Sequence, residues 1–315
     1  MEERVDGLGY YNRMALYWVA AFLFLSSFFL PDERALLQEK SLEGIAMILL
    51  GLASDAFLLF SVYITAEPVV PRHKDRITAM LLSAAMLFAC PGALVFSEIH
   101  IAAIALLWAQ FCLLKEEYFA AFFLMGISSM FFPPVLWVAL LVIVLMLLAG
   151  LTDKLRNILK FLGGLIVPYL LYWGVLFVIH GNLLPMLAAG LSVWEKMTFI
   201  TLDFFSLEIP KLFLVFCLGV MCIHATLLFM SKMSEYGIAE SYALKVQIIN
   251  VAVSAAIFIL FSSAQVHSVA ILACCPVAVL LSRYFSQYGS SPFLRVEIVI
   301  LLCALVVSRL GNFIV

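Results

Sequence analysis

The sequence predicts an all-α protein, a polytopic bundle of transmembrane helices, on the basis of three observations. Of its 315 residues, 65% are hydrophobic and only 12% are charged, whereas an average soluble domain is about 45–50% apolar and about 25% charged. The mean hydropathy is +1.14. Apolar runs of about the 20 residues needed to cross a bilayer follow one another along almost the whole chain. This composition excludes a soluble domain, a disordered chain and a secreted disulfide scaffold.

The first apolar run begins at Met14, after Arg4 and Arg13, and ends before Pro31. No cleavage site of small residues follows it, so we predict a retained first helix rather than a signal peptide. The predicted spans are 14–30, 44–66, 77–96, 99–114, 118–132, 134–151, 158–179, 209–231, 246–263, 267–282 and 293–311.

Two adjacent prolines make the number of spans ambiguous. The residue before a proline is disfavoured in the α conformation, so Pro133 and Pro134 should interrupt the apolar run that contains them. The interruption either separates two short spans or forms one kinked, re-entrant hairpin. The sequence therefore predicts 10 or 11 spans.

The distribution of positive charge predicts the orientation. With 11 spans, 13 of the 18 lysines and arginines fall on the side of the N-terminus, and five fall on the opposite side. Because positive residues concentrate in cytoplasmic segments, we expect the N-terminus inside and the C-terminus outside. The inner connections are short, so residues 1–315 form one integral membrane domain, with a helical half over 1–179, an outer-face segment over 180–208 and C-terminal spans over 209–315.

The outer-face segment has an amphipathic pattern. Leu184, Leu187, Leu191 and Trp194 are spaced so that they share one face of a helix. A tryptophan at the edge of such a helix suits an interfacial helix that lies on the outer leaflet. The alternative is a loop that packs over the mouth of the bundle.

Charge and cysteine content limit the chemistry. The net charge is −2 and there is no basic stripe, which argues against nucleic-acid binding. Cys217, Cys222 and His224 are close in sequence, but the two cysteines fall on different helix faces and no second ligand pair follows, so no metal site is predicted. Signatures of phosphate-binding loops, dinucleotide-binding folds, serine hydrolases and zinc proteases are absent from the sequence, and no cofactor is predicted.

The outer loops hold the first group of candidate site residues. Asp32 and Glu33 directly follow the first span, and Glu98 and His100 lie in the second outer loop, at the same expected membrane level. A carboxylate there could act as a general base toward an acceptor hydroxyl, or could bind a divalent cation beside a phosphate. The alternatives are a solvated loop around Asp32 and a simple turn cap formed by Glu98 and His100.

Asp55 is the candidate at bilayer depth, near the middle of the second span. Ionisable residues inside a membrane usually face the bundle interior and mark function. The expected partners of Asp55 are other buried polar groups such as Gln110 or Asn250. A protonated aspartate can also simply hydrogen-bond two helices together, and this structural reading stays open.

The region from Arg72 to His180 carries a resemblance to a known family. Its characteristic stretches are Leu81-Leu82-Ser83-Ala84-Ala85, Cys90-Pro91, Lys115-Glu116-Glu117-Tyr118, Gly126-Ile127-Ser128-Ser129, Phe131-Phe132-Pro133-Pro134 and Gly163-Gly164. This pattern resembles a family of uncharacterised multi-pass inner-membrane proteins of Bacteroidetes, a domain of unknown function.

The order of features over 1–179 is also similar to the scaffold of GT-C glycosyltransferases, which take sugars from polyprenyl-phosphate carriers. Those enzymes place an acidic pair just after the first span, where this chain has Asp32 and Glu33, and Glu98 falls where a second outer acid often lies. The first outer loop is shorter here than in GT-C enzymes. The resemblance implies that Asp32 acts as a base toward an acceptor hydroxyl, which then takes the sugar from the lipid carrier.

Three functions follow as hypotheses. The first is a GT-C-like protein of envelope glycan or lipid assembly that binds an isoprenoid-phosphate lipid in a lateral groove, with Asp32 as base, supported by Glu33, Glu98 and His100 beneath the Trp194 segment. The second is a transporter or flippase with a polar path along Asp55, Gln110 and Asn250. The third is a non-catalytic scaffold that binds membrane lipids and other proteins of an envelope complex.

Overall fold

The structure, a computed structural model, describes residues 10–29, 42–89, 94–151, 155–181, 191, 208–261, 266–288 and 291–314. Within these ranges the chain forms α-helices, one short 3₁₀-helix over Met233–Glu235 and no strand. The α-helices are α1 Tyr10–Ser27, α3 Leu42–Thr65, α4 His73–Ala89, α5 Glu98–Leu114, α6 Tyr118–Phe131, α7 Val135–Leu148, α8 Leu155–His180, α10 Ile209–Ser231, α11 Ile238–Phe261, α12 Val266–Tyr288 and α13 Pro292–Ile314.

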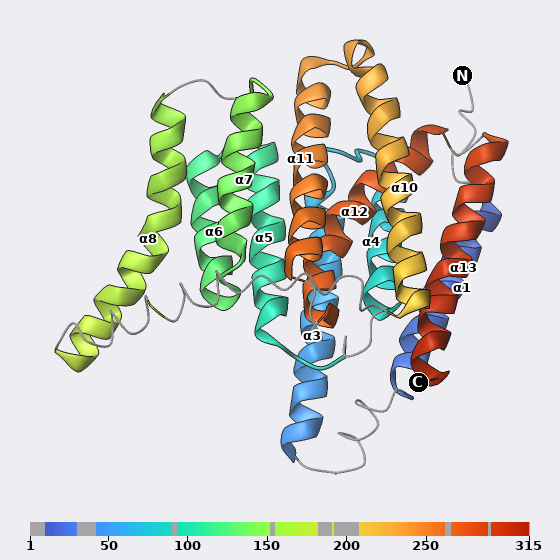
Figure 1. The fold of residues 1–315 in the computed structure, drawn as a ribbon, viewed down its shortest axis with the longest axis horizontal. Coiled ribbons are helices and arrows are strands. Elements are labelled where there is room, and N and C mark those ends of the chain that lie inside the picture. The colour runs from blue at the N-terminus through green and yellow to red at the C-terminus, as the bar shows by residue number, and fades with distance from the viewer. Residues whose placement is uncertain are drawn as a thin grey trace.

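Successive helices run in alternating directions along one bundle (Figure 1). As a result, α1 begins at the end of the bundle opposite to the end where α13 finishes. We call the end where α1 begins the inner end and the other the outer end, following the predicted orientation. Over the residues that the structure describes, five helical segments are long and apolar enough to cross a membrane: Glu43–Thr65, Arg156–His180, Ile209–Ser231, Ile238–Leu260 and Val269–Tyr288.

The α-helices named above follow the predicted spans in order, but several ends differ. The span predicted over 246–263 begins at Ile238, and the span predicted over 267–282 continues to Tyr288. Hydropathy marks only the apolar part of a helix, whereas these polar ends stay helical because they bond to one another. At the inner end Arg283 pairs with Glu240, and the hydroxyl of Ser286 donates to Oδ2 of Asp75 at 2.6 Å.

The predicted break at the two prolines is confirmed. α6 ends at Phe131 and α7 starts at Val135, and the two helices run in opposite directions with their turn toward the outer end (Figure 1). Each has 14 residues, which corresponds to about 21 Å at 1.5 Å per residue. This is shorter than the hydrocarbon core of about 30 Å, so the re-entrant alternative stays open.

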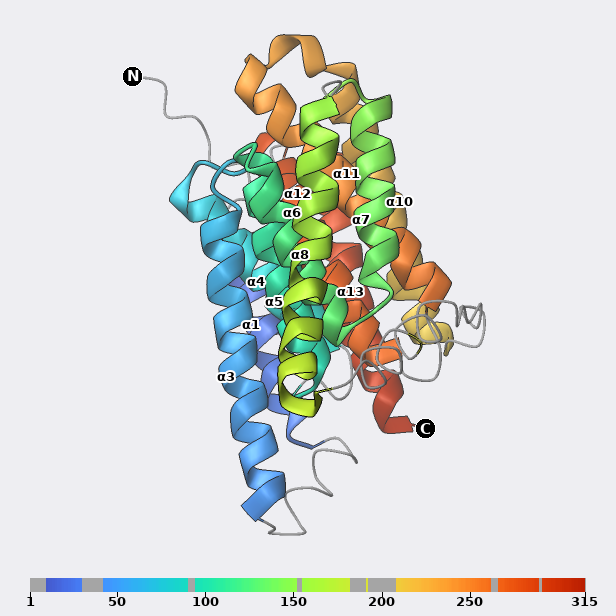
Figure 2. The same cartoon turned by 90° about the vertical axis from the view of Figure 1, so that its left-hand side faces the viewer.

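The helices differ greatly in burial. Of the most apolar stretch of 18 residues in α12, 78% is buried inside the protein, whereas the share in the corresponding stretch of α8 is 11%. α8 leans away from the bundle and packs mainly on α6 (Figures 1 and 2). Its contact with α6 depends on small residues, since a Cβ added at Gly164 would lie 2.6 Å from the carbonyl oxygen of Phe119. Such close approach through glycine is typical of helix packing in membranes.

Candidate functional site

The residues predicted at the outer rim do not form one described cluster. Asp32, Glu33 and Trp194 lie outside the described residues. Glu98 is the first residue of α5 and is exposed, whereas His100, two positions later, is buried. The two residues expected to act together in the second outer loop therefore face different surroundings.

The start of α5 is held against the middle of α3. The backbone N–H of Phe96 donates to the carbonyl oxygen of Met47 at 3.3 Å. A Cβ added at Gly51 would lie 2.1 Å from the carbonyl oxygen of Leu94, so only glycine allows the two backbones to come this close. α3 extends outward beyond this level (Figures 1 and 2). A residue midway along α3 thus lies beside the first turn of α5.

This stagger brings Asp55 and His100 together. Nε2 of His100 lies 3.4 Å from Oδ1 of Asp55, and the side chains are only 1% and 2% exposed. The sequence predicted Gln110 or Asn250 as the partner of Asp55, and the contact that the structure shows is with His100 instead. Gln110 and Asn250 are buried as well. The pair joins one residue expected at the rim with one expected at bilayer depth.

The other ring nitrogen of His100 contacts Ser97. The backbone N–H of Ser97 donates to Nδ1 at 3.2 Å, and the carbonyl oxygen and hydroxyl of Ser97 lie 3.2 and 3.0 Å from the same nitrogen. When Nδ1 accepts the backbone N–H, the neutral ring carries its proton on Nε2, which faces Asp55. Ser97 therefore sets the orientation of the imidazole.

The carboxylate of Asp55 is incompletely satisfied. Neither of its oxygens receives a hydrogen bond of normal geometry from a described residue. A charge-assisted N–H···O bond measures about 2.7–2.9 Å, so the 3.4 Å contact with His100 is a loose one. Cys275 of α12 interacts electrostatically with the same carboxylate. A buried carboxylate with so few donors calls for a chemical explanation.

Sequence reasoning missed a second histidine–carboxylate cluster, formed by His224, Tyr284 and Glu297. Nδ1 of His224 lies 2.9 Å from Oε1 of Glu297 and 2.8 Å from the hydroxyl of Tyr284. The hydroxyl of Tyr284 donates to Oε2 of Glu297 at 2.9 Å. An ionised carboxylate can only accept, so we infer that Nδ1 of His224 carries a proton.

The signal for this cluster was present but incomplete. His224 and Glu297 are ionisable residues inside predicted spans, which by itself marks them as candidates. What the sequence did not show is that α10 and α13 are neighbours, with α12 beside them. In the part of the chain that the structure describes, no three His, Cys, Asp or Glu side chains are grouped so as to hold a metal ion.

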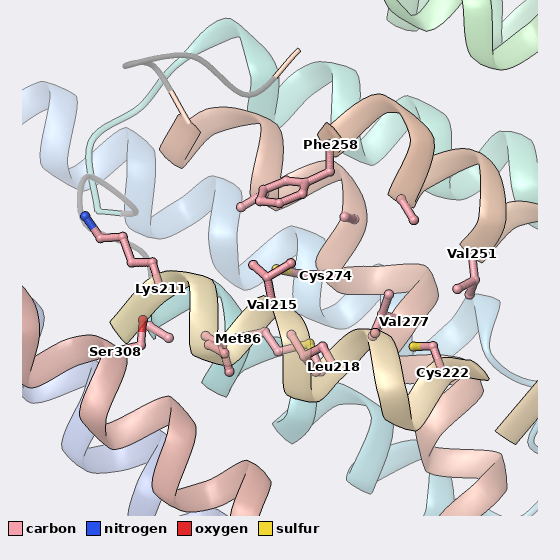
Figure 3. A pocket seen from close by; sticks show the side chains of 16 residues that line it. Met86, Lys211, Val215, Leu218, Cys222, Val251, Phe258, Cys274, Val277 and Ser308 are labelled. Carbon is pink, nitrogen blue, oxygen red and sulfur yellow. The ribbon is translucent and has the colours of Figure 1, made fainter. Parts of the chain in front are cut away.

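A groove between α10 and α11, with α12 as its floor, forms a third feature (Figure 3). Its cavity volume is about 170 Å³, and 16 residues line it. Nearly all of them are apolar, and the polar exceptions Lys211 and Ser308 lie together at the outer end of the groove (Figure 3). Cys222 and Val251 lie at its opposite end, near the middle of the bundle.

These observations define the class of protein, an α-helical protein with several helices long and apolar enough to cross a membrane and with its described polar clusters between helices. The chain belongs to a family of unknown function (DUF6427), whose model matches residues 14–313. The match extends well beyond the stretch from Arg72 to His180 on both sides. No curated protein and no solved structure matches the chain.

Proposed function

We propose that this protein is a multi-pass protein of a bacterial inner membrane that binds a polyprenyl-phosphate-type lipid during envelope glycan or lipid assembly. The observation that carries this proposal is the apolar groove between α10 and α11, with Lys211 at its outer end. An inside N-terminus and an outside C-terminus are supported by the asymmetry of lysine and arginine and by the alternation of the helices.

The dimensions of the groove suit one lipid chain. From Lys211 to Cys222 the groove follows 11 residues of α10, which corresponds to about 16 Å. This is about half the thickness of the hydrocarbon core, or the depth of one leaflet. Small residues such as Ala255, Ala273 and Gly219 leave room for the methyl branches of an isoprenoid chain.

Lys211 suits the phosphate. Its ammonium lies 3.1 Å from Oε2 of Glu208, and the two side chains are 18% and 34% exposed. A lysine has three donor protons, so Glu208 leaves two of them for a phosphate. Surface ion pairs are worth only about 0–1 kcal/mol, so partial replacement of Glu208 by a phosphate costs little.

The GT-C-like mechanism is the finer part of the proposal. In it, Asp32 acts as the base and Glu33 as its acidic neighbour, a divalent cation can bridge carboxylate and phosphate, and other envelope proteins supply or accept the glycan. These roles are supported by the resemblance in the sequence. A Bacteroidetes origin has the same support.

The lipid proposal is tested on the purified full-length protein in nanodiscs by native mass spectrometry with undecaprenyl phosphate, undecaprenol and phosphatidylglycerol. We expect undecaprenyl phosphate to be retained best. Lys211→Gln should weaken its retention about tenfold relative to undecaprenol, because a hydrogen bond to a charged group is worth about 1.5–3 kcal/mol. Lys232→Gln, at the other end of α10, is the matched control.

A second variant fills the groove. A Cβ at Gly219 meets no atom within 4 Å, so Gly219→Phe should project into the groove without disturbing the fold. Gly174→Phe on α8 is its control, since Gly174 is equally open and lies outside the groove. If Gly219→Phe retains the lipid as the wild type does, the groove is not the binding site.

One observation favours a second candidate function, a transporter or flippase. An acid and a histidine are buried together within the bundle, as Asp55 and His100 are, and such residues mark proton relays in transporters. The groove is lined by neither of them, nor by Gln110 or Asn250. If no lipid is retained and no proton-linked uptake is found, the scaffold hypothesis is the better one.

A further inference from the structure

The buried pair of Asp55 and His100 holds two ionisable groups in apolar surroundings. In water at neutral pH an isolated aspartate is ionised and an isolated histidine is mostly neutral, so together they would carry one negative charge. Among the described residues, the only ion-pair partner of Asp55 is His100. A net charge in such surroundings is very costly and is normally removed by a change of protonation. One additional proton makes the pair neutral overall.

Ser97 allows the imidazole to accept that proton. Its backbone N–H lies 3.2 Å from Nδ1 of His100 and can donate to the neutral ring. Its carbonyl oxygen at 3.2 Å and its hydroxyl at 3.0 Å can instead accept from Nδ1–H of the charged ring. Both states of the imidazole are therefore hydrogen-bonded without movement of the backbone. The oxygens of Asp55, which lack close donors, offer the alternative position for the proton.

The pair is connected to one end of the bundle. Ser97 is only partly buried and the next residue, Glu98, is exposed, so Ser97 lies between the imidazole and the protein surface near the outer end. Toward the inner end, α3 and α5 continue with buried apolar side chains such as Leu58 and Leu106, which are 1% and 2% exposed. Exchange with the outer side is thus favoured.

Among the residues that the structure describes, no other strongly charged group pairs with Asp55 in place of the proton. Besides His100 of α5, Cys275 of α12 is a titratable group that interacts electrostatically with Asp55. α4 also packs on α3, but its titratable residues lie in its first turn, between His73 and Arg76, at the inner end.

We propose that Asp55 and His100 form a proton-binding site within the membrane, which holds one shared proton at neutral pH and exchanges it with the outer side through Ser97. The site lies apart from the groove between α10 and α11, whose lining includes none of these residues. The proposal therefore stands or falls independently of lipid binding.

Infrared difference spectroscopy tests the site on the full-length protein in nanodiscs, with and without isotope-labelled histidine. On titration from neutral to alkaline pH, the wild type should lose one carboxylic acid or imidazolium signal. Asp55→Asn should lack this signal, and Glu43→Gln, an exposed acid on the same helix, should keep it. If the wild type shows an ionised carboxylate and a neutral imidazole already at neutral pH, the proposal is wrong.

Two further variants keep the test decisive if Asp55→Asn folds poorly. In His100→Gln the proton has only Asp55 to bind, so a carboxylic acid band should be present at neutral pH, and an ionised carboxylate there would contradict the proposal. Ser97→Ala keeps the backbone groups and removes the hydroxyl. It should slow proton exchange in deuterated buffer while the titration midpoint stays close to that of the wild type, and an unchanged exchange rate would overturn the proposed route.

Discussion

Two histidine–carboxylate pairs lie toward opposite ends of the bundle and differ in how completely their hydrogen bonds are satisfied. Toward the outer end, His100 and Asp55 are 3.4 Å apart and almost fully buried. Toward the inner end, His224 and Glu297 are 2.9 Å apart, with 34% and 14% of their side chains exposed, and Tyr284 bonds to both. The inner pair is more exposed and has an additional hydrogen-bond donor in Tyr284, whereas the outer pair is almost fully buried and its carboxylate lacks close donors.

Both pairs consist of a histidine and a carboxylic acid, and the difference shows that their surroundings give them different roles. Buried polar groups are normally hydrogen-bonded, and a fully bonded cluster mainly makes helix packing specific. The inner cluster joins α10, α12 and α13 and needs no further ligand. The outer pair lacks donors for its carboxylate, and a bound proton supplies what is missing.

The largest effect that would sharpen this comparison is expected for His100→Leu. Removing one partner of a buried pair typically costs about 3–5 kcal/mol, and here Asp55 must bind the proton alone, although an aspartate in the unfolded chain is ionised at neutral pH. We expect thermal unfolding in nanodiscs to show this loss at neutral pH and a smaller loss at acidic pH, where Asp55 is protonated in the unfolded chain as well. Replacing both residues by leucine should recover most of the stability. If the double variant is as unstable as His100→Leu alone, the loss does not come from the carboxyl of Asp55 left without its partner.

The next effect concerns the contact that positions the outer pair. Gly51→Ala would place a Cβ 2.1 Å from the carbonyl oxygen of Leu94, so the segment that carries Ser97 must move. Overpacking of this kind costs about 1–3 kcal/mol, measured again by thermal unfolding. The hydrogen bonds of Glu297 should be unaffected. Gly174→Ala, where the added atom meets nothing within 4 Å, is the control.

A smaller loss is expected at the inner cluster. Tyr284→Phe removes the hydroxyl that donates to Glu297, and a typical hydrogen bond contributes about 0.5–1.5 kcal/mol. Because the contact between His224 and Glu297 remains, the loss should vary little with pH. Chemical or thermal unfolding at several pH values measures this. A loss as large and as pH-dependent as that of His100→Leu would show that the two clusters are alike after all.

The smallest effect is expected for Glu98→Gln. Glu98 is exposed, although it lies only two residues from His100. Exposed substitutions of this kind usually change stability by no more than about 0.5 kcal/mol. A much larger change in the unfolding temperature would mean that Glu98 belongs to the buried pair.

The sequence contained most of the information about which segments are helical. Apolar runs located the helices, and Pro133 and Pro134 located the break between α6 and α7. The ends of α11 and α12 were misjudged because Glu240 and Arg283 stay helical through contacts between helices, which hydropathy does not register. Contacts between residues that are far apart in the sequence depend on which helices pack together. Apolar runs locate the helices but do not show which of them are neighbours.

The candidate site was predicted in its residues but not in its geometry. Asp55 and His100 were each recognised as candidates, yet they were expected at different membrane levels. The prediction assumed that all outer helix ends are level, whereas α5 begins beside the middle of α3. The sequence analysis expected a lateral groove but did not predict which helices would form one. The predicted convergence of Asp32 with Glu98 stays a prediction, since Asp32 lies outside the described residues.

The leaning helix α8 has a mechanical consequence. No residue from Leu170 to Gly181 is buried, so α8 is fixed to α6 only up to Pro168 and Tyr169, whose hydroxyl lies 2.7 Å from that of Ser129. Pro168 removes a backbone hydrogen bond inside the helix and weakens it at the junction between the two halves. An apolar helix accommodates a change of bilayer thickness by tilting, at a cost of fractions of a kcal/mol per ångström. The outer half of α8 can therefore follow the thickness of the surrounding membrane while the rest of the bundle keeps its packing.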